Sequence, residues 1–253
     1  MDSCRPDQVL CRVVDRVQLQ FFDVHSESWT SPIPLSAAIE VRNSAFLLLS
    51  TQSLVCVGGY DSKYQSFLRT ALLIASAGTI SELPCLAVAR CGIGLVEHEG
   101  RVWGFGGRDV RVGPVVERLR LVGENWELAR EMSTARAYFS PVVYEEEAYL
   151  YGGLTLSCEC FSFLTETYRP LSYDLPESSE SLTVLLPTGF VILTGRYITR
   201  LPYKQGESTQ QEARIDCVKS SCGPLAFGAA LFVISEGEAW KVDLDSCRVA
   251  LLR

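Results

Sequence analysis

The sequence predicts an all-β protein built from repeated sheets, and three observations support this prediction. Three apolar, strand-like segments end in a double glycine, and their second glycines lie 48 and 46 residues apart: LVCVGG at 54–59, VWGFGG at 102–107 and YLYGG at 149–153. An arginine stands 17 residues before each second glycine, at Arg42, Arg90 and Arg136. No long segment keeps a helical period of apolar residues.

Each repeat has room for about four short strands. Segments such as VQLQFFDV at 17–24 and VERLRLV at 116–122 carry the β-branched and aromatic residues typical of strands, between turn-forming residues. A four-stranded sheet buries only part of its surface alone, so tandem copies stack face to face around an axis. We therefore expect a β-propeller of about six four-stranded blades, some incomplete, forming one domain over residues 1–253.

The repeat weakens in the second half of the chain. The segment LPTGFVILTG ends at Gly195, and Ser178 occupies the position of the arginine. A further unit aligns Lys219 with Glu236 at the same spacing. The segment ending at Trp29 and the tail 238–253 are expected to supply outer strands, which gives the count of about six blades, some of them incomplete.

Composition excludes several classes of protein. The chain of 253 residues has a net charge of −7 and an isoelectric point near 5.0, which disfavours sequence-independent binding of nucleic acid. No apolar stretch reaches the roughly 20 residues of a membrane helix. The N-terminal MDSCRPDQVL lacks the apolar core of an export signal, and the ten cysteines are expected to be reduced thiols. These features predict a cytoplasmic protein.

The double glycine, the upstream Trp126 and the repeated arginine together resemble the kelch repeat. The segment ENWELAREMSTARAYFSPVVYEEEAYLYGG at 124–153 is nearly complete, and the resemblance is clear over residues 29–153 and thin after Leu154. It implies a kelch-type propeller, a fold that says little about function by itself. We expect structural roles for the glycine pairs and, for Trp29 and Trp126, places in the core between blades.

The repeated arginines Arg42, Arg90 and Arg136 have two interpretations. Each side chain either braces its own blade by bonding backbone carbonyls or points into the central mouth. Kelch relatives that capture peptides use the residues after this arginine and after the double glycine. Carried over, the resemblance nominates Asn43, Ser44, Tyr60, Gly92, Arg108, Arg111, Tyr138, Leu154, Arg196, Tyr197 and Ser220.

A mouth lined by arginine and tyrosine suits an acidic or carboxylate-bearing peptide or protein. The alternative is that these arginines are solvated loop charges paired with Asp61, Asp109 or Glu117, each pair contributing about 0 to 1 kcal/mol.

The sequence offers little catalytic chemistry. His25 and His98 are the only histidines, and both are interpreted as exposed turn residues. Cys158 and Cys160, and the pair Cys217 and Cys222, do not form zinc-ribbon spacings, and nucleotide and nucleophile-elbow motifs are absent. Glu145, Glu146 and Glu147 are expected at a solvated hairpin tip. We therefore predict no catalytic residue, no metal and no cofactor.

The sequence thus predicts a non-enzymatic protein–protein interaction module. It would act as a scaffold, an adaptor or a subunit of a larger assembly, including a cytoskeletal one, and capture a partner through its loop face. The alternatives are an isomerase- or lyase-type enzyme acting on a small molecule, and a sugar-binding propeller.

Overall fold

The structure is a computed structural model, and every regular element in it is a β-strand. It describes residues 9–14, 17–23, 26–36, 42–51, 53–111, 113, 115–120, 125–203, 211–214, 225–227, 230–235, 238–243 and 248–252. Within these ranges no helix is long and apolar enough to cross a membrane.

Six sheets contain four strands each, and in five of them, which we number blades 2 to 6, the four antiparallel strands pair in a single path. Their strands are β5 (Ala45–Leu48), β6 (Leu54–Val57), β9 (Ala71–Ile74) and β10 (Ile80–Leu83); β11 (Gly94–His98), β12 (Arg101–Phe105), β13 (Val116–Arg120) and β14 (Glu127–Leu128); β15 (Val142–Tyr144), β16 (Glu147–Tyr151), β17 (Cys158–Ser162) and β18 (Thr167–Pro170); β19 (Ser181–Leu186), β20 (Gly189–Thr194), β21 (Tyr197–Leu201) and β22 (Gln211–Arg214); β23 (Leu225–Phe227), β24 (Ala230–Ser235), β25 (Glu238–Asp243) and β26 (Val249–Leu252).

The N-terminal sheet, blade 1, has a different order. It contains β1 (Val9–Val14), β2 (Gln18–Asp23), β3 (Ser28–Trp29) and β4 (Ile33–Pro34), and both β3 and β4 pair with β2. A small hairpin of β7 (Tyr60–Asp61) and β8 (Ser66–Phe67) is inserted between the second and third strands of blade 2.

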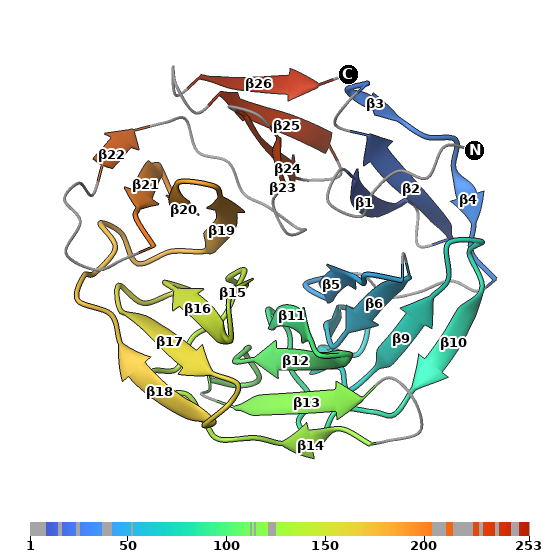
Figure 1. Ribbon diagram of the computed structural model, residues 1–253. Helices are drawn as coiled ribbons and strands as arrows, with labels where there is room; N and C mark the ends of the chain where they lie inside the picture. Colours follow the sequence, from blue (N-terminus) through green and yellow to red (C-terminus); the bar gives the residue numbers. More distant parts are fainter. Residues whose placement is uncertain are drawn as a thin grey trace.

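The sheets are arranged around a centre, with β5, β11, β15, β19 and β23 innermost and β10, β14, β18, β22 and β26 outermost (Figure 1). The innermost strands of blades 2 to 6 contact one another in succession, and β1 lies beside β24, which closes the ring. The prediction of an all-β, kelch-type propeller is confirmed, with five complete blades and an incomplete N-terminal one.

The core lies between adjacent blades rather than at the centre. Successive residues of β12 point to opposite faces of blade 3: Val102 packs toward blade 2, with Val55, and Trp103 packs toward blade 4, with Leu150. Both faces of the sheet are therefore covered. Each fully buried side chain of this kind contributes about 1.5–3 kcal/mol, and this burial stabilises the stacking of the repeats.

The double glycines pack against the backbone of the next blade. Gly106 has φ +62°, and a Cβ there would overlap the carbonyl oxygen of Arg136. The amide of Gly107 donates a hydrogen bond of 2.9 Å to that same carbonyl. The pair before β7 repeats this arrangement, since Gly59 donates to the carbonyl of Arg90 at 3.0 Å. In these two joints the glycines and arginines recur together because the glycine pair packs on the arginine of the next blade, whereas Gly152 packs against Leu175 and Ser181.

The tryptophans divide into two cases. Trp126 is 7% exposed and packs in the core between blades 2 and 3, as expected. Trp29 is half-buried and packs edge-on against Phe22 at a centroid distance of 5.2 Å. Because Trp29 and Phe22 are directly paired across β3 and β2, this contact lies within one sheet, which differs from the predicted contact between blades.

Candidate functional site

Blades 2 to 5 share one strand order, so their equivalent loops lie at the same end of the ring. We call this end the loop face. It contains the loops between the second and third strands of each blade, at 58–70, 106–115, 152–157 and 195–196. The connections into the innermost strands, at 84–93, 129–141 and 171–180, reach the same end.

A chain of backbone hydrogen bonds runs along the inner rim of this face. Gly92 donates to the carbonyl of Asn43 at 3.1 Å, Tyr138 donates to Gly92 at 2.8 Å, and Ser181 donates to Tyr138 at 3.0 Å. Asn43, Gly92 and Tyr138 have φ values of +54°, +64° and +58°. Left-handed conformation is unfavourable for a residue as large as tyrosine, so the surrounding bonds must impose it. The rim is therefore a rigid frame for the loops.

Arg90 and Arg136 are buried braces and do not line the mouth. Arg136 is fully buried, and its guanidinium bonds Glu159 at 2.9 Å and the carbonyls of Gly152 and Ser157 at 2.6 and 3.0 Å. Arg90, 2% exposed, forms an ion pair with Glu117 and donates to the carbonyl of Gly104. Their assignment to partner binding is corrected: the bracing interpretation holds, with a buried glutamate added to the carbonyls.

The electrostatics of these pairs follow from their burial. Burial lowers the pKa of Arg90, and the adjacent carboxylate of Glu117 acts in the opposite direction. Removing a charge from water costs several kcal/mol, and a partner ion with full hydrogen bonding offsets that cost. Glu117 receives further bonds from the amides of Ala87 and Val88, so its carboxylate is well satisfied.

Arg42 is exposed, unlike the other two repeated arginines. In blades 3 and 4 the glutamate that pairs with the repeated arginine lies on the third strand. There it is opposite the residue that stands three positions before the second glycine of the double glycine. In blade 2 that position pairs Cys56 with Leu72, so no acid is present there. The guanidinium of Arg42 instead donates to Ser62 at 2.7 Å and lies 5.8 Å from the ring centre of Tyr60. Arg42 and Tyr60 thus remain on the loop face.

The loop that follows the double glycine of blade 3 projects two arginines. Cys91 and Arg108 form a backbone bridge that fixes the base of the loop. Asp109 accepts the amide of Arg111 at 2.8 Å on its carboxylate, and its own amide donates to the carbonyl of Arg111 at 3.0 Å. The loop is therefore tightly turned, and it presents Arg108, Arg111 and the 83% exposed Val110 to solvent.

The β7–β8 hairpin adds an aromatic tip to the same face. Tyr60 packs edge-on against Phe67, with ring centres 5.3 Å apart. The carboxylate of Asp61 accepts the amides of Lys63 and Tyr64 at 2.8 and 3.2 Å, which shapes the turn. Tyr64 is 69% exposed at its tip.

Tyr138 lies half-buried on the rim. Its ring fills the space next to Gly92, where a Cβ would be 2.8 Å from the ring, and its hydroxyl lies 3.3 Å from the Sγ of Cys91. Burial raises the pKa of the Cys91 thiol and also that of the Tyr138 hydroxyl. Both groups stay protonated at neutral pH, so neither supplies a nucleophile.

The remaining nominated residues lie on blades 4 and 5. Leu154 has φ +65° and is 39% exposed, and Leu156 beside it is 42% exposed. Arg196 is exposed in the short β20–β21 turn, where Glu177 lies over the preceding glycine, and Tyr197 begins β21 half-buried. Asn43 is exposed and Ser44 is buried, its hydroxyl donating to the carbonyl of Gly58. Ser220 falls outside the described residues.

In the described ranges, the loop face carries cations without an ion-pair partner. The carboxylates of Asp61 and Asp109 accept backbone amides of their own loops, and Glu117 is buried with Arg90. Of the predicted pairings of arginines with these three acids, the described residues show that of Glu117, with Arg90, and this pair is buried instead of solvated. Within the described part of the chain, Arg108, Arg111 and Arg196 form no ion pair.

Sequence reasoning nominated Leu154 and missed the rest of the apolar part of this face. Of the eight exposed large apolar residues in the described ranges, four lie on these loops: Tyr64, Val110, Leu154 and Leu156. A large apolar residue inside a predicted loop, next to glycine or aspartate, is the pattern that indicates such positions. Apolar surface beside arginine is the usual composition of a protein-binding surface.

No family model matches the sequence. A kelch repeat protein of myxoma virus (strain Lausanne), M-T8, is 28% identical over 142 residues, which are 54% of this chain and 27% of the viral protein. The matched segment thus spans about a quarter of that relative. The ring of four-stranded blades is a β-propeller, and the double-glycine repeats and this similarity support a kelch-type one.

Proposed function

We propose that the chain is a protein-interaction module that captures a peptide or protein partner on its loop face. The observation that carries the proposal is the group of exposed cations Arg108, Arg111 and Arg196, which have no ion-pair partner in the described residues and project from tightly bonded loops. Preformed loops lose little conformational freedom on binding, which favours affinity.

The side chains of the loop face favour a partner with acidic and apolar residues together. A guanidinium binds a carboxylate through two parallel hydrogen bonds, and an unpaired arginine gives up no internal ion pair to do so. The exposed Tyr64, Val110 and Leu154 supply apolar contacts around these cations. A role as scaffold, adaptor or complex subunit follows from the same binding surface.

The proposal is tested by replacing the three arginines together. Proximity labelling in cells identifies partners of the unaltered chain, and the affinity of a purified partner is then measured for Arg108→Ala/Arg111→Ala/Arg196→Ala. Loss of one interface arginine of this type costs about 1–2 kcal/mol or more, so the triple variant should bind at least about tenfold more weakly.

Arg101→Ala is the matched control, because Arg101 begins β12 at the opposite end of blade 3. It should bind like the unaltered chain. Equal binding by the triple variant would show that partners bind elsewhere. A thermal-shift screen with small metabolites addresses the enzymatic alternative, since a ligand at 100 times its dissociation constant stabilises the fold by about 2.7 kcal/mol.

A further inference from the structure

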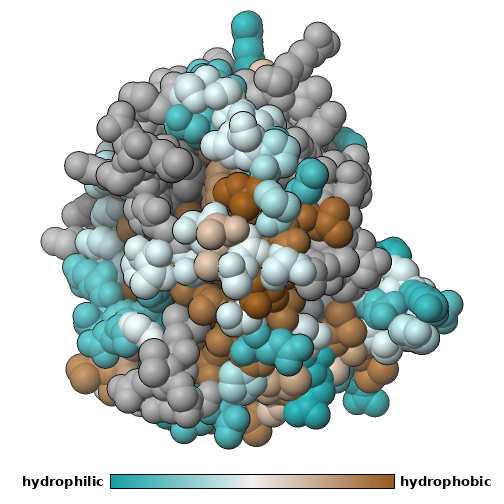
Figure 2. All heavy atoms as spheres, turned by 90° about the vertical axis from the view of Figure 1, so that its right-hand side faces the viewer, coloured by the Kyte–Doolittle hydropathy of each residue, from teal (hydrophilic) through white to brown (hydrophobic). Residues whose placement is uncertain are grey.

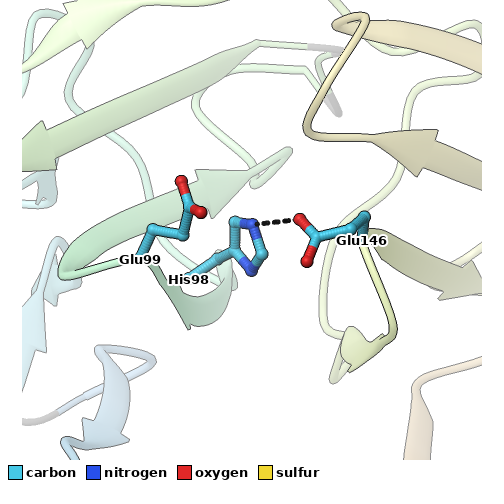
Figure 3. A group of neighbouring side chains, drawn as sticks. All are labelled: His98, Glu99 and Glu146. Carbon is cyan, nitrogen blue, oxygen red and sulfur yellow. Dashed lines mark ion pairs between the residues drawn. The ribbon is translucent and has the colours of Figure 1, made fainter.

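Three potential metal ligands meet at the end of the ring opposite the loop face. His98 ends β11, Glu99 follows it in the β11–β12 turn, and Glu146 comes from the β15–β16 turn of the next blade (Figure 3). One ligand atom of each lies within 4.8 Å of the others, and the Nε2 of His98 is 3.2 Å from the carboxylate of Glu146. The group therefore bridges blades 3 and 4.

The imidazole of His98 is held in place by its neighbours. It is 13% exposed and stacks on Phe163, with ring centres 3.9 Å apart and planes 12° apart. Phe163 in turn packs against Trp103 at 5.2 Å, and its amide donates to the carbonyl of Glu146 at 3.1 Å. One residue thus positions both the imidazole and the turn that carries Glu146. His98 is not the exposed turn residue expected from the sequence.

The turn after His98 places a second carboxylate beside it. Neighbouring residues of a strand point to opposite faces, which would separate Glu99 from His98. Glu99 and Gly100 instead have φ values of +47° and +69°, so the chain reverses at once. The carboxylate of Glu99 lies next to the imidazole, while that of Glu146 approaches its Nε2 (Figure 3).

We propose that His98, Glu99 and Glu146 form a binding site for a divalent metal ion and that the site is best suited to Zn²⁺. The bound ion would link blades 3 and 4. An imidazole nitrogen with two carboxylate oxygens suits zinc, with water at the remaining position, whereas Mg²⁺ and Ca²⁺ take oxygen ligands alone. Bond lengths near 2.0–2.2 Å place tetrahedral ligand atoms about 3.4 Å apart. The exposed carboxylates need to move little to reach that spacing.

The test is calorimetric titration of the reduced full-length chain with zinc chloride. The variants His98→Gln and Glu146→Gln should each bind zinc about tenfold more weakly or worse, since even residues that only orient ligands cost 10–100-fold. Glu145→Gln is the matched control: it removes the same charge from the same exposed turn without removing a ligand, and should bind as the unaltered chain does. Far-ultraviolet circular dichroism checks that each variant is folded.

The ten cysteines offer competing sites, so cobalt provides a second measurement. Cobalt bound by these three residues should show visible d–d bands without a thiolate charge-transfer band, and His98→Gln should abolish them. The proposal is overturned if the unaltered chain binds no zinc, if the two ligand variants bind as Glu145→Gln does, or if all bound cobalt shows thiolate charge transfer.

Discussion

The buried ion pair between Arg136 and Glu159 should make Glu159→Gln severely destabilising. The substitution keeps the shape of the side chain but leaves the guanidinium, with no exposed surface, without its counter-ion. Two carbonyls would still accept its protons. Breaking a buried pair from one side costs about 3–5 kcal/mol. At about 2–4 °C per kcal/mol for a chain of this size, the melting temperature should fall by roughly 6–20 °C.

Removing both members of the pair should cost much less. Replacing a buried pair by apolar residues is often neutral or stabilising, so Arg136→Met/Glu159→Leu should recover most of the loss. In blade 2 the acid is already absent, since Leu72 occupies the position of Glu159, and the repeated arginine of that blade, Arg42, is exposed. The free energies of unfolding of the unaltered chain, of Arg136→Met, of Glu159→Leu and of the double variant give the coupling energy of the pair directly.

Urea unfolding followed by tryptophan fluorescence measures these values, because Trp103 and Trp126 are buried. The control is Arg169→Met, which breaks the exposed pair with Glu147 at 2.7 Å and should cost at most about 1 kcal/mol. If Glu159→Gln is as mild as this control, or if the double variant loses the sum of its two single variants, the reasoning about buried charge is refuted.

Three further predictions concern the joints and the core. Gly106→Ala should lose clearly more stability in urea than Gly100→Ala, because both have positive φ but only at Gly106 would the Cβ overlap a carbonyl; equal losses would contradict this. Thr199→Val should leave the free energy of unfolding unchanged or raise it, because the buried hydroxyl of Thr199 has no partner in the described residues. By contrast, Ser181→Ala removes a 2.5 Å hydrogen bond to the carbonyl of Tyr151 and should lower the free energy of unfolding by about 1–3 kcal/mol. Burial raises the pKa of Cys56 and of Cys158 to about 12. The contribution of these thiols to the free energy of unfolding is therefore complete below the pKa of an unfolded thiol and is lost as the pH rises toward 12. At pH 8, peptide mapping after alkylation should find Cys85 modified and Cys56 and Cys158 protected.

The joints between blades could be predicted from the sequence, because they depend on residues that recur. Glycine pairs and arginines at constant spacing indicated a repeated unit, and the structure shows the first two pairs packed against the arginine of the next blade. The glutamate partners could not be predicted. Glu117 lies in the alternating segment VERLRLV, where a charged residue is expected to face solvent, yet it is fully buried.

The grouping of His98 with Glu146 was also hidden in the sequence. The two residues lie on successive repeats, and only the stacking of blades brings their turns together. A search for metal ligands within one short segment finds Glu97, His98 and Glu99 and does not reach Glu146. The loop face was easier to predict, since Arg108 and Arg111 follow directly from the position of the double glycine.

The hydrogen bonds of the inner rim hold the spacing between neighbouring blades. Asn43, Gly92, Tyr138 and Ser181 connect blades 2 to 5 in succession, and further backbone bonds lie beside them, such as that of Gly107 to the carbonyl of Arg136. Blades 1 and 6 meet through β1 and β24 and through an ion pair of Glu27 with Lys241. A ligand that contacts two neighbouring loops of that arc therefore binds loops whose spacing is held by backbone hydrogen bonds. Between blades 1 and 6, the described residues hold the spacing through the contact of β1 with β24 and through this ion pair.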